Sequence, residues 1–330
     1  MTNRRPLDPA FVGGQRSLLP SRLVGSLRLL GMTAAVGAAV GAGLLGYAHW
    51  ESRRPILRRA TLKVPGSRQL RILHISDLHM YAGQDFIGDF LAQVAAEEQI
   101  DLVVSTGDNL GDADGIDPLL AAHEPLLHLP GVFVLGSNDY YSPLNKPWLS
   151  YLRRDRHKKT AALHANQETD LPWFKLVEHL TDSGWVDLSN RSATIDIPTE
   201  DGYQLVSLVG VDDPHIHRNR APKVATSWSD PAALKLALTH APYRQVLDQF
   251  SELGADLVMA GHTHGGQIRI PGFGALVTNS DLPRAYSRGL KWWPGPNGGT
   301  WVNVSAGLGT SPMAPIRFAC RPEATLLTIT

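Results

Sequence analysis

The sequence predicts an α/β protein with one globular domain that follows an N-terminal apolar helix. Short apolar runs alternate with stretches of helical periodicity between residues 70 and 135, which is typical of strands that alternate with helices. Several of these apolar runs end directly before His, Asp or Asn residues. The chain of 330 residues, 43% hydrophobic and 19% charged, is long enough for a domain with a sizeable core.

The N-terminal apolar run covers residues 29–50 and contains no charged side chain. As a helix it would be roughly 33 Å long, about the thickness of the hydrocarbon core of a membrane. We favour an uncleaved membrane anchor over a signal peptide cut after Gly46 and Ala48, because the run is long for a signal and arginines follow it at once. The predicted organisation is a basic tail at 1–28, a transmembrane anchor or signal segment at 29–50, a basic linker at 51–67 and a catalytic domain at 68–330.

Charge and cysteine content exclude some classes of function. Lys and Arg total 31, as do Asp and Glu, so bulk charge gives no reason to expect a nucleic-acid partner. Cys320 is the only cysteine, which rules out an internal disulfide and a thiolate metal cluster. A metal would therefore be held by His, Asp, Asn, Glu or backbone groups.

The elements of the domain follow from apolar spacing. Runs of four to eight apolar residues indicate buried strands, and apolar residues three and four positions apart indicate helices. The predicted order is strand 70–75, helix 86–99, strand 102–105, helix 118–129, strand 132–135, helix 173–182, strands 193–197, 204–209 and 234–238, helix 243–253, and strands 256–259, 299–305 and 324–329.

Metal-ligand residue types follow five of these strands. In chain order they are Asp77 and His79, Asp108, the segment Gly136–Asp139, His240, and finally His262 with His264. Ligands of α/β sheets collect outside the carboxyl ends of the strands, so these side chains can converge. Imidazole and carboxylate together favour Mn, Fe, Zn or Co. Each motif alone is weak, but the ordered set predicts a metal site.

This ordered set resembles the calcineurin-like metallophosphoesterase superfamily, and the GHTHGGQ motif at 261–267 is similar to its membrane-associated bacterial branch. The resemblance covers residues 68–330. It implies a sandwich of two mixed β-sheets flanked by helices, two divalent metal ions, and a single-pass protein of the bacterial plasma membrane. It also implies the ligand sets: Asp77, His79, Asp108 and His264 for one metal, and Asp108, His240, His262 and an Asn for the other, with Asp108 bridging.

The third motif departs from the family pattern. The family reads G-N-H-D or G-N-H-E, whereas this chain reads Gly136-Ser137-Asn138-Asp139. Either Ser137 or Asn138 could complete the second metal shell, and we favour Asn138 because an amide oxygen is the better ligand. The family's catalytic imidazole is missing here. Asp139 or a histidine further along, His215 or His217, is the candidate replacement.

The function that these motifs predict is two-metal hydrolysis of a phosphoester or pyrophosphate bond. A phosphodiesterase near the membrane, with a lipid-linked phosphate among its candidate substrates, fits best; the alternative is a catalytically impaired metal-binding protein on the same fold. A metallopeptidase or amidohydrolase would show an early H-x-H or an H-E-x-x-H, and neither is present.

Other residues around the motifs have less certain roles. We expect His74, Asn109 and Thr263 to orient the ligands. The basic run at 153–159 could be a lid over the site or a solvated helix face. Trp292 and Trp293 could line the site, although packing is the favoured interpretation.

Overall fold

A computed structural model describes residues 21–143, 167–200 and 202–330, with side chains from residue 35 onward. The chain divides into two compact units, Met1–Gly46 and Tyr47–Thr330. The basic run at 153–159 and most of the basic tail at 1–28 lie outside the described residues.

The N-terminal apolar run lies within helix α1, Ser21–Ser52. In the parts of the chain that the structure describes, no helix is both long enough and apolar enough to cross a membrane. The expectation of a helix at 29–50 is thus confirmed, but a transmembrane helix is not found there.

Part of the predicted linker is a strand. Residues Ile56–Leu62 form β1, which pairs in parallel with β14, Glu323–Ile329. The pattern was hidden because Arg58 and Arg59 interrupt the apolar alternation, and both are ion-paired, with Glu323 and Glu98. Charged side chains are common on an edge strand, where they discourage pairing with other chains. The first sheet therefore includes residues that precede position 68.

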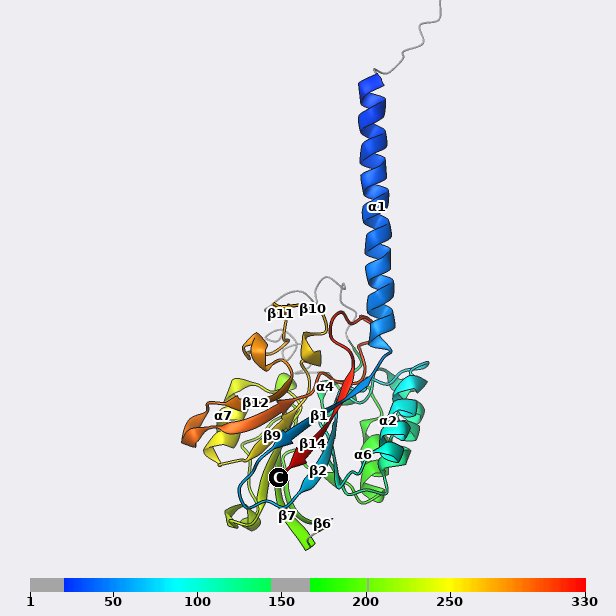
Figure 1. The fold of residues 1–330 in the computed structure, drawn as a ribbon. Coiled ribbons are helices and arrows are strands. Elements are labelled where there is room, and N and C mark those ends of the chain that lie inside the picture. The colour runs from blue at the N-terminus through cyan, green and yellow to red at the C-terminus, as the bar shows by residue number, and fades with distance from the viewer. Residues whose placement is uncertain (1–20, 144–166, 201) are drawn as a thin grey trace, which may run out of the picture. The chain divides into compact units, whose positions relative to one another are not determined.

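Two six-stranded mixed sheets form the domain (Figure 1). The first has the order β1-β14-β2-β3-β4-β5, with β2 at Leu70–Ile75, β3 at Leu102–Ser105, β4 at Gly131–Phe133 and β5 at Val186–Asp187. The second has the order β12-β13-β9-β8-β7-β6, with β6 at Ser192–Thr199, β7 at Gly202–Gly210, β8 at Leu234–Thr239, β9 at Leu257–Ala260, β12 at Gly289–Trp293 and β13 at Thr300–Val304. A short hairpin is formed by β10, Arg269–Ile270, and β11, Gly274–Ala275.

Helices cover the outer faces of the two sheets. Figure 1 shows α2 and α6 on one side and α7 on the other. The helices are α2 at Asp85–Glu97, α3 at Ile116–His123, the short α4 at Ser137–Tyr140, α6 at Trp173–Asp182 and α7 at Arg244–Glu252.

The core consists of three apolar layers, and β2 shows how they arise. Its side chains alternate: Leu70 and Ile72 lie in the layer between the sheets, whereas Leu73 and Ile75 lie in the layer beneath α2 and α3. A third layer lies beneath α7 and includes Trp293. Period-two alternation on strands buried on both faces thus gives the predicted sandwich, and Trp293 packs as expected. Its neighbour Trp292 is half-exposed and contacts Trp301 edge to face.

Candidate metal centre

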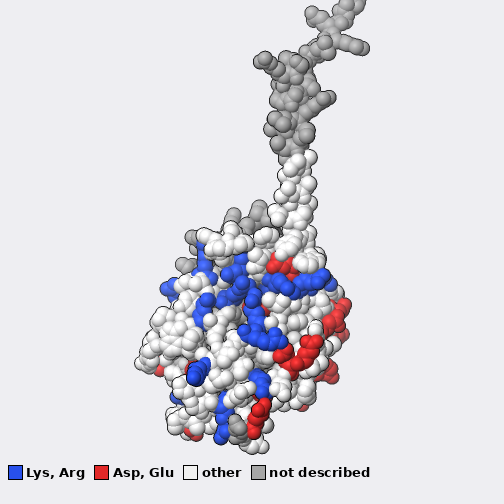
Figure 2. Space-filling view, viewed as in Figure 1, with Lys and Arg blue, Asp and Glu red and all other residues white. Residues whose placement is uncertain are grey.

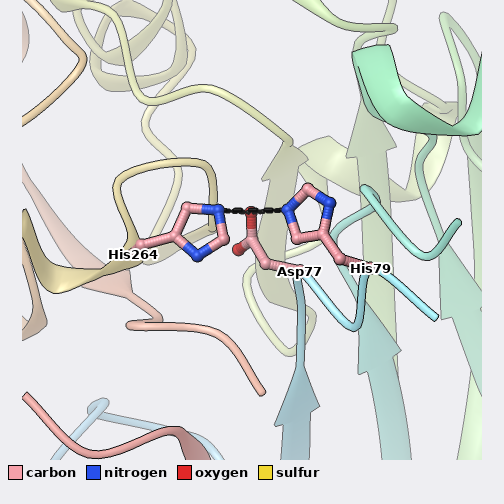
Figure 3. Close-up of side chains that lie close together, drawn as sticks. All are labelled: Asp77, His79 and His264. Carbon is pink, nitrogen blue, oxygen red and sulfur yellow. Dashed lines mark hydrogen bonds and ion pairs between the residues drawn. The ribbon is translucent and has the colours of Figure 1, made fainter. Parts of the chain in front are cut away.

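The first cluster joins the turn after β2 to the turn after β9. Asp77, His79 and His264 lie close enough for one ion to contact all three (Figure 3). The Nε2 atoms of His79 and His264 are 3.1 Å apart. They lie 4.0 Å and 3.5 Å from Asp77 Oδ1. Lone-pair atoms of three buried or half-buried side chains therefore point at one small volume.

The second cluster joins the ends of β3, β8 and β9. Asp108, His240 and His262 again lie within reach of one ion. His240 Nε2 lies 3.3 Å from Asp108 Oδ2 and 3.3 Å from His262 Nδ1. The remaining nitrogens donate to backbone carbonyls, His240 Nδ1 to Thr106 at 2.7 Å and His262 Nε2 to Asn279 at 3.0 Å. In the neutral form of each ring, these bonds place the proton on the nitrogen that faces away and leave the nitrogen that faces the cluster able to bind a metal.

Asp108 links the clusters. Its Oδ2 atom is 3.6 Å from His79 Nε2 in the first cluster and 3.3 Å from His240 Nε2 in the second. A shared carboxylate is what a two-metal site requires, because it offsets the repulsion between cations about 3.5–4 Å apart. The structure therefore brings together all six Asp and His residues that the motifs singled out.

Five of these six residues have a left-handed backbone. The φ angles are 51° at Asp77, 43° at His79, 55° at Asp108, 67° at His262 and 49° at His264. Non-glycine residues rarely adopt this conformation, and it concentrates at functional sites, where the surrounding structure imposes it. The sharp turns after the strands thus aim the ligands inward at a cost in backbone energy.

Gly136 is required by close packing beneath Asp108. A Cβ atom at this position would lie 2.4 Å from Asp108 Oδ1 and 2.8 Å from His240 Nδ1. No side chain fits there, so the glycine of the third motif lets the turn approach the bridging carboxylate.

Asn138 lies directly beside the bridging carboxylate. Its backbone N–H donates to Asp108 Oδ1 at 2.7 Å, and its side-chain amide lies 2.8 Å from Asp108 Oδ2. The amide oxygen and nitrogen can exchange by a flip, so the oxygen can face an ion bound at Asp108. Ser137 is buried as the first residue of α4.

Asp139 lies beneath the turn that carries Asp108. It is fully buried, and its carboxylate accepts hydrogen bonds from the backbone N–H groups of Gly136, Asp108 and Asn109 at 2.8–3.0 Å. Burial raises the pKa of Asp139 to about 6. Asp139 thus holds the turn that carries Asp108, and its role as the acid for the leaving group stays a prediction.

The two other candidate acids lie in different surroundings. The His215 ring lies 4.4 Å from the His262 ring, and its Nδ1 is 2.8 Å from the Tyr243 hydroxyl. His217 is exposed at the end of the turn Pro214–Ile216. Of the two, only His215 contacts a residue of the clusters.

The electrostatics of the centre fit bound cations. Burial raises the pKa of Asp77 to about 7, so its ionised form needs a nearby positive charge. Burial would also raise the pKa of Asp108, but His240 outweighs burial and holds that pKa well below its usual range. Two buried carboxylates facing four imidazoles are a donor set suited to divalent metals.

Several supporting residues gave no recognisable signal in the sequence. Thr106 and Asn279 orient the two imidazole rings through backbone carbonyls, and any residue type could supply those. Ser76 donates to Asp77 Oδ2 at 2.7 Å. The predicted supporting residue Thr263 does lie beside the centre, where its hydroxyl donates to the Ser287 carbonyl. The largest fully buried side chain among the described residues, Arg317, also contacts the centre, although it is 53 positions from His264 and follows no motif strand.

The comparisons with known proteins agree with this geometry. The family model for calcineurin-like phosphoesterases matches residues 70–266. An uncharacterized metallophosphoesterase of Aquifex aeolicus is 26% identical over 87% of this chain and 96% of the relative. UDP-2,3-diacylglucosamine pyrophosphatase LpxG of Chlamydia trachomatis is 27% identical over 90% and 97%, and phosphodiesterase YaeI of Escherichia coli is 24% identical over 92% and 99%. With six ligands on one rim and more than half of its length matched, the chain belongs to the calcineurin-like phosphoesterase family of metal-dependent phosphoester hydrolases.

Proposed function

We propose that this enzyme hydrolyses a phosphodiester or pyrophosphate bond at a membrane surface, with a lipid-linked phosphate as its substrate class. The observation that carries the proposal is the Asp108 carboxylate, which faces both ligand clusters. Members of the family use two metal ions, and the chain has a ligand set for each.

Each group of residues has a distinct task. When bound, two divalent ions neutralise charge on the phosphate and activate the attacking water. Asp108 sets the spacing of the two sites, and the carbonyls of Thr106 and Asn279 fix the orientation of the His240 and His262 rings. Asn138 completes the second ligand set through its amide oxygen.

The altered third motif favours a substrate with a good leaving group. The family's imidazole is replaced by Asn138, and Asp139 is enclosed by backbone N–H groups. A general acid typically contributes 10²–10⁴-fold to a rate. A phosphate or nucleotide leaving group needs much less protonation than an alkoxide, so a pyrophosphate bond is the better match. The name of the Chlamydia relative describes a pyrophosphatase acting on a diacylated sugar nucleotide.

The uncharged N-terminal run and the basic surface of the domain support a membrane location. Residues 29–50 carry no charge and lie within α1. Figure 2 shows Lys and Arg spread over the face that carries β1 and β14. Basic residues near the end of α1, β1 and the start of β14 are Arg53, Arg54, Arg58, Arg59 and Arg321. Such a surface would attract anionic headgroups and anionic substrates.

Metal removal and a substrate panel test the proposal. The full-length chain is stripped with EDTA, and activity towards bis-p-nitrophenyl phosphate is expected to fall to background and to return with added Mn²⁺. Full activity after complete metal removal would exclude the two-metal reaction. The panel compares a lipid pyrophosphate with a lipid-linked alkyl phosphodiester, and turnover of the alkyl diester as fast as the pyrophosphate would contradict the leaving-group argument.

The same motif supports a second candidate, a metal-binding protein with impaired catalysis. Its support is that Asn138, which is not an imidazole, stands where the family has its catalytic histidine in the third motif. The two candidates differ in turnover: the impaired protein would bind two metals but hydrolyse no activated diester.

A further inference from the structure

Arg317 is a fully buried arginine directly behind the first cluster. It has no exposed surface and is the largest completely buried side chain among the described residues. Its Nη2 atom lies 3.3 Å from His264 Nδ1, the ring nitrogen that faces away from Asp77 and His79. The guanidinium therefore lies against the back of one proposed metal ligand.

The same guanidinium holds the loop that supports a second ligand. Nη2 donates to the carbonyls of Ala306 at 2.7 Å, Gly307 at 3.1 Å and Gly309 at 2.7 Å. The Gly309 N–H in turn donates to the Asp77 carbonyl at 2.7 Å. Gly307 packs so closely on Asp77 that a Cβ atom there would lie 2.6 Å from the Asp77 Cβ. Arg317 thus contacts the surroundings of Asp77 and His264, and none of its hydrogen bonds reaches Asp108, His240 or His262.

The last turns of α1 hold the segment that carries Arg317. The Arg317 N–H donates to the Ala48 carbonyl at 2.9 Å. Glu51 is almost completely buried, and its two oxygens accept the N–H groups of Ala319 at 3.0 Å and Cys320 at 2.8 Å. Ala319 has a φ of 51°, a conformation that alanine adopts only under constraint. Figure 1 shows this segment, just before β14, beside the end of α1.

Stability alone does not explain this arginine. Among the described residues, no carboxylate lies within ion-pair distance of Arg317, and its Nε has no hydrogen-bond partner. A buried charge without a direct counter-charge is costly, and an apolar side chain of similar volume would usually be as stable or more so. Apart from a bond from Nη1 to the Cys320 carbonyl at 3.5 Å, its side-chain contacts go to His264 and to the loop beside Asp77.

We propose that Arg317 is a positioning residue for the ion held by Asp77, His79 and His264, and that Glu51 in the last turn of α1 fixes Arg317 in place. The end of α1 is then part of the metal centre and not only a connection to the N-terminal segment. This inference rests on the two-metal centre of the proposed function but not on the substrate, because its test counts metal ions.

The test measures metal binding by the full-length chain. Wild type, Arg317→Met and Glu51→Gln are stripped of metal and titrated with Mn²⁺, and bound manganese is counted by elemental analysis after desalting. Loss of a residue that orients a ligand typically weakens metal binding about 10–100-fold. We expect Arg317→Met to weaken the binding of one of the two ions by that factor and to leave the binding of the other unchanged. Glu51→Gln should affect the same ion by a smaller factor.

Double variants identify which ion is lost. His240→Ala removes a ligand of the second cluster, so combining it with Arg317→Met should leave no tightly bound ion. Asp77→Asn already damages the first cluster, so adding Arg317→Met should cause little further loss. The matched control is Arg321→Met: Arg321 lies in the same segment and donates to the carbonyls of Arg54 and Pro55, away from both clusters.

Each outcome decides the proposal. The proposal would be overturned if Arg317→Met bound two ions with wild-type affinity. It would also be overturned if the affinity for both ions fell equally, because that would indicate a merely structural role. If Arg317→Met does not fold, Arg317→Lys and Glu51→Gln decide, and wild-type binding of both ions in these two variants would likewise overturn it. A chain that binds two ions but cleaves no phosphodiester would refute the proposed function and leave this inference standing.

Discussion

The two metal clusters use the same kinds of ligand but are held by different kinds of support. In the second cluster, His240 and His262 donate to the backbone carbonyls of Thr106 and Asn279. In the first, the ring of His264 lies against the cation of Arg317. A carbonyl behind an imidazole accepts the ring proton and so leaves the opposite nitrogen free for a metal, whereas a guanidinium has no acceptor and cannot take that role. Arg317 instead donates to the backbone carbonyls that surround the first cluster.

This difference predicts that the clusters respond differently to change. The second cluster depends on turns that directly follow its own strands, on the Asn279 carbonyl and on the carboxylate of Asp139 beneath the Asp108 turn. The first depends on a C-terminal segment that is itself attached to α1 through Glu51. We therefore expect the ion of the first cluster to be the more easily lost of the two.

A change at Asp108 should affect both clusters, and not only one of them. Because its Oδ2 atom faces both His79 and His240, Asp108→Asn removes a ligand from both clusters at once. The loss of bound metals should cost several kcal/mol of transition-state stabilisation, or about three orders of magnitude in kcat/KM. Metal counting together with kinetics on an activated diester measures this.

Asp77→Asn is the comparison variant for Asp108→Asn. It should lose only the ion of the first cluster, because Asp77 contacts His79 and His264 and lies outside the second ligand set. Two tightly bound ions in Asp108→Asn would show that the carboxylate does not bridge.

Asn138 tests the second cluster alone. Asn138→Ala should weaken the binding of one ion about 10–100-fold, because it removes the amide beside Asp108. Ser137→Ala should leave both ions in place. Manganese titration of the two variants decides between the two readings of the third motif, and the reverse result would make Ser137 the ligand.

The sequence predicted the ligands better than their supports, for a physical reason. A ligand must have a particular side chain at the end of a strand, so Asp77 and His264 leave a pattern in the sequence. The carbonyl of Asn279 can come from any residue, and Arg317 contacts the site only after the chain has folded. The strands buried on both faces could be predicted equally well from the sequence. The edge strand β1 was missed because its two arginines made the segment look like a basic linker.

A chain of hydrogen bonds beneath the first cluster gives the smallest and most local prediction. The Ser76 hydroxyl donates to Asp77 Oδ2, and the Thr106 hydroxyl donates to Ser76, both at 2.7 Å. Thr106 has no second proton to give, so it accepts from His74 Nε2 at 3.0 Å, and His74 Nδ1 accepts from the Asn303 amide at 2.8 Å. His74 must therefore be neutral, and burial lowers its pKa to about 3.

The pH dependence of stability follows from this neutral histidine. In the unfolded chain His74 takes up a proton near pH 6.5, whereas in the folded chain it does not until about pH 3. The unfolded state thus binds one more proton across this window, and the free energy of unfolding should fall by about 1.4 kcal/mol for each pH unit as the pH drops. Denaturation of the metal-free chain at pH 6, 5 and 4 should show this slope reduced by that amount in His74→Gln, while His128→Gln, a change at an exposed histidine, should keep the wild-type slope. Equal slopes in all three proteins would mean that His74 can be protonated within the folded chain, and the hydrogen bonds that lead to Asp77 would then have to run in another direction.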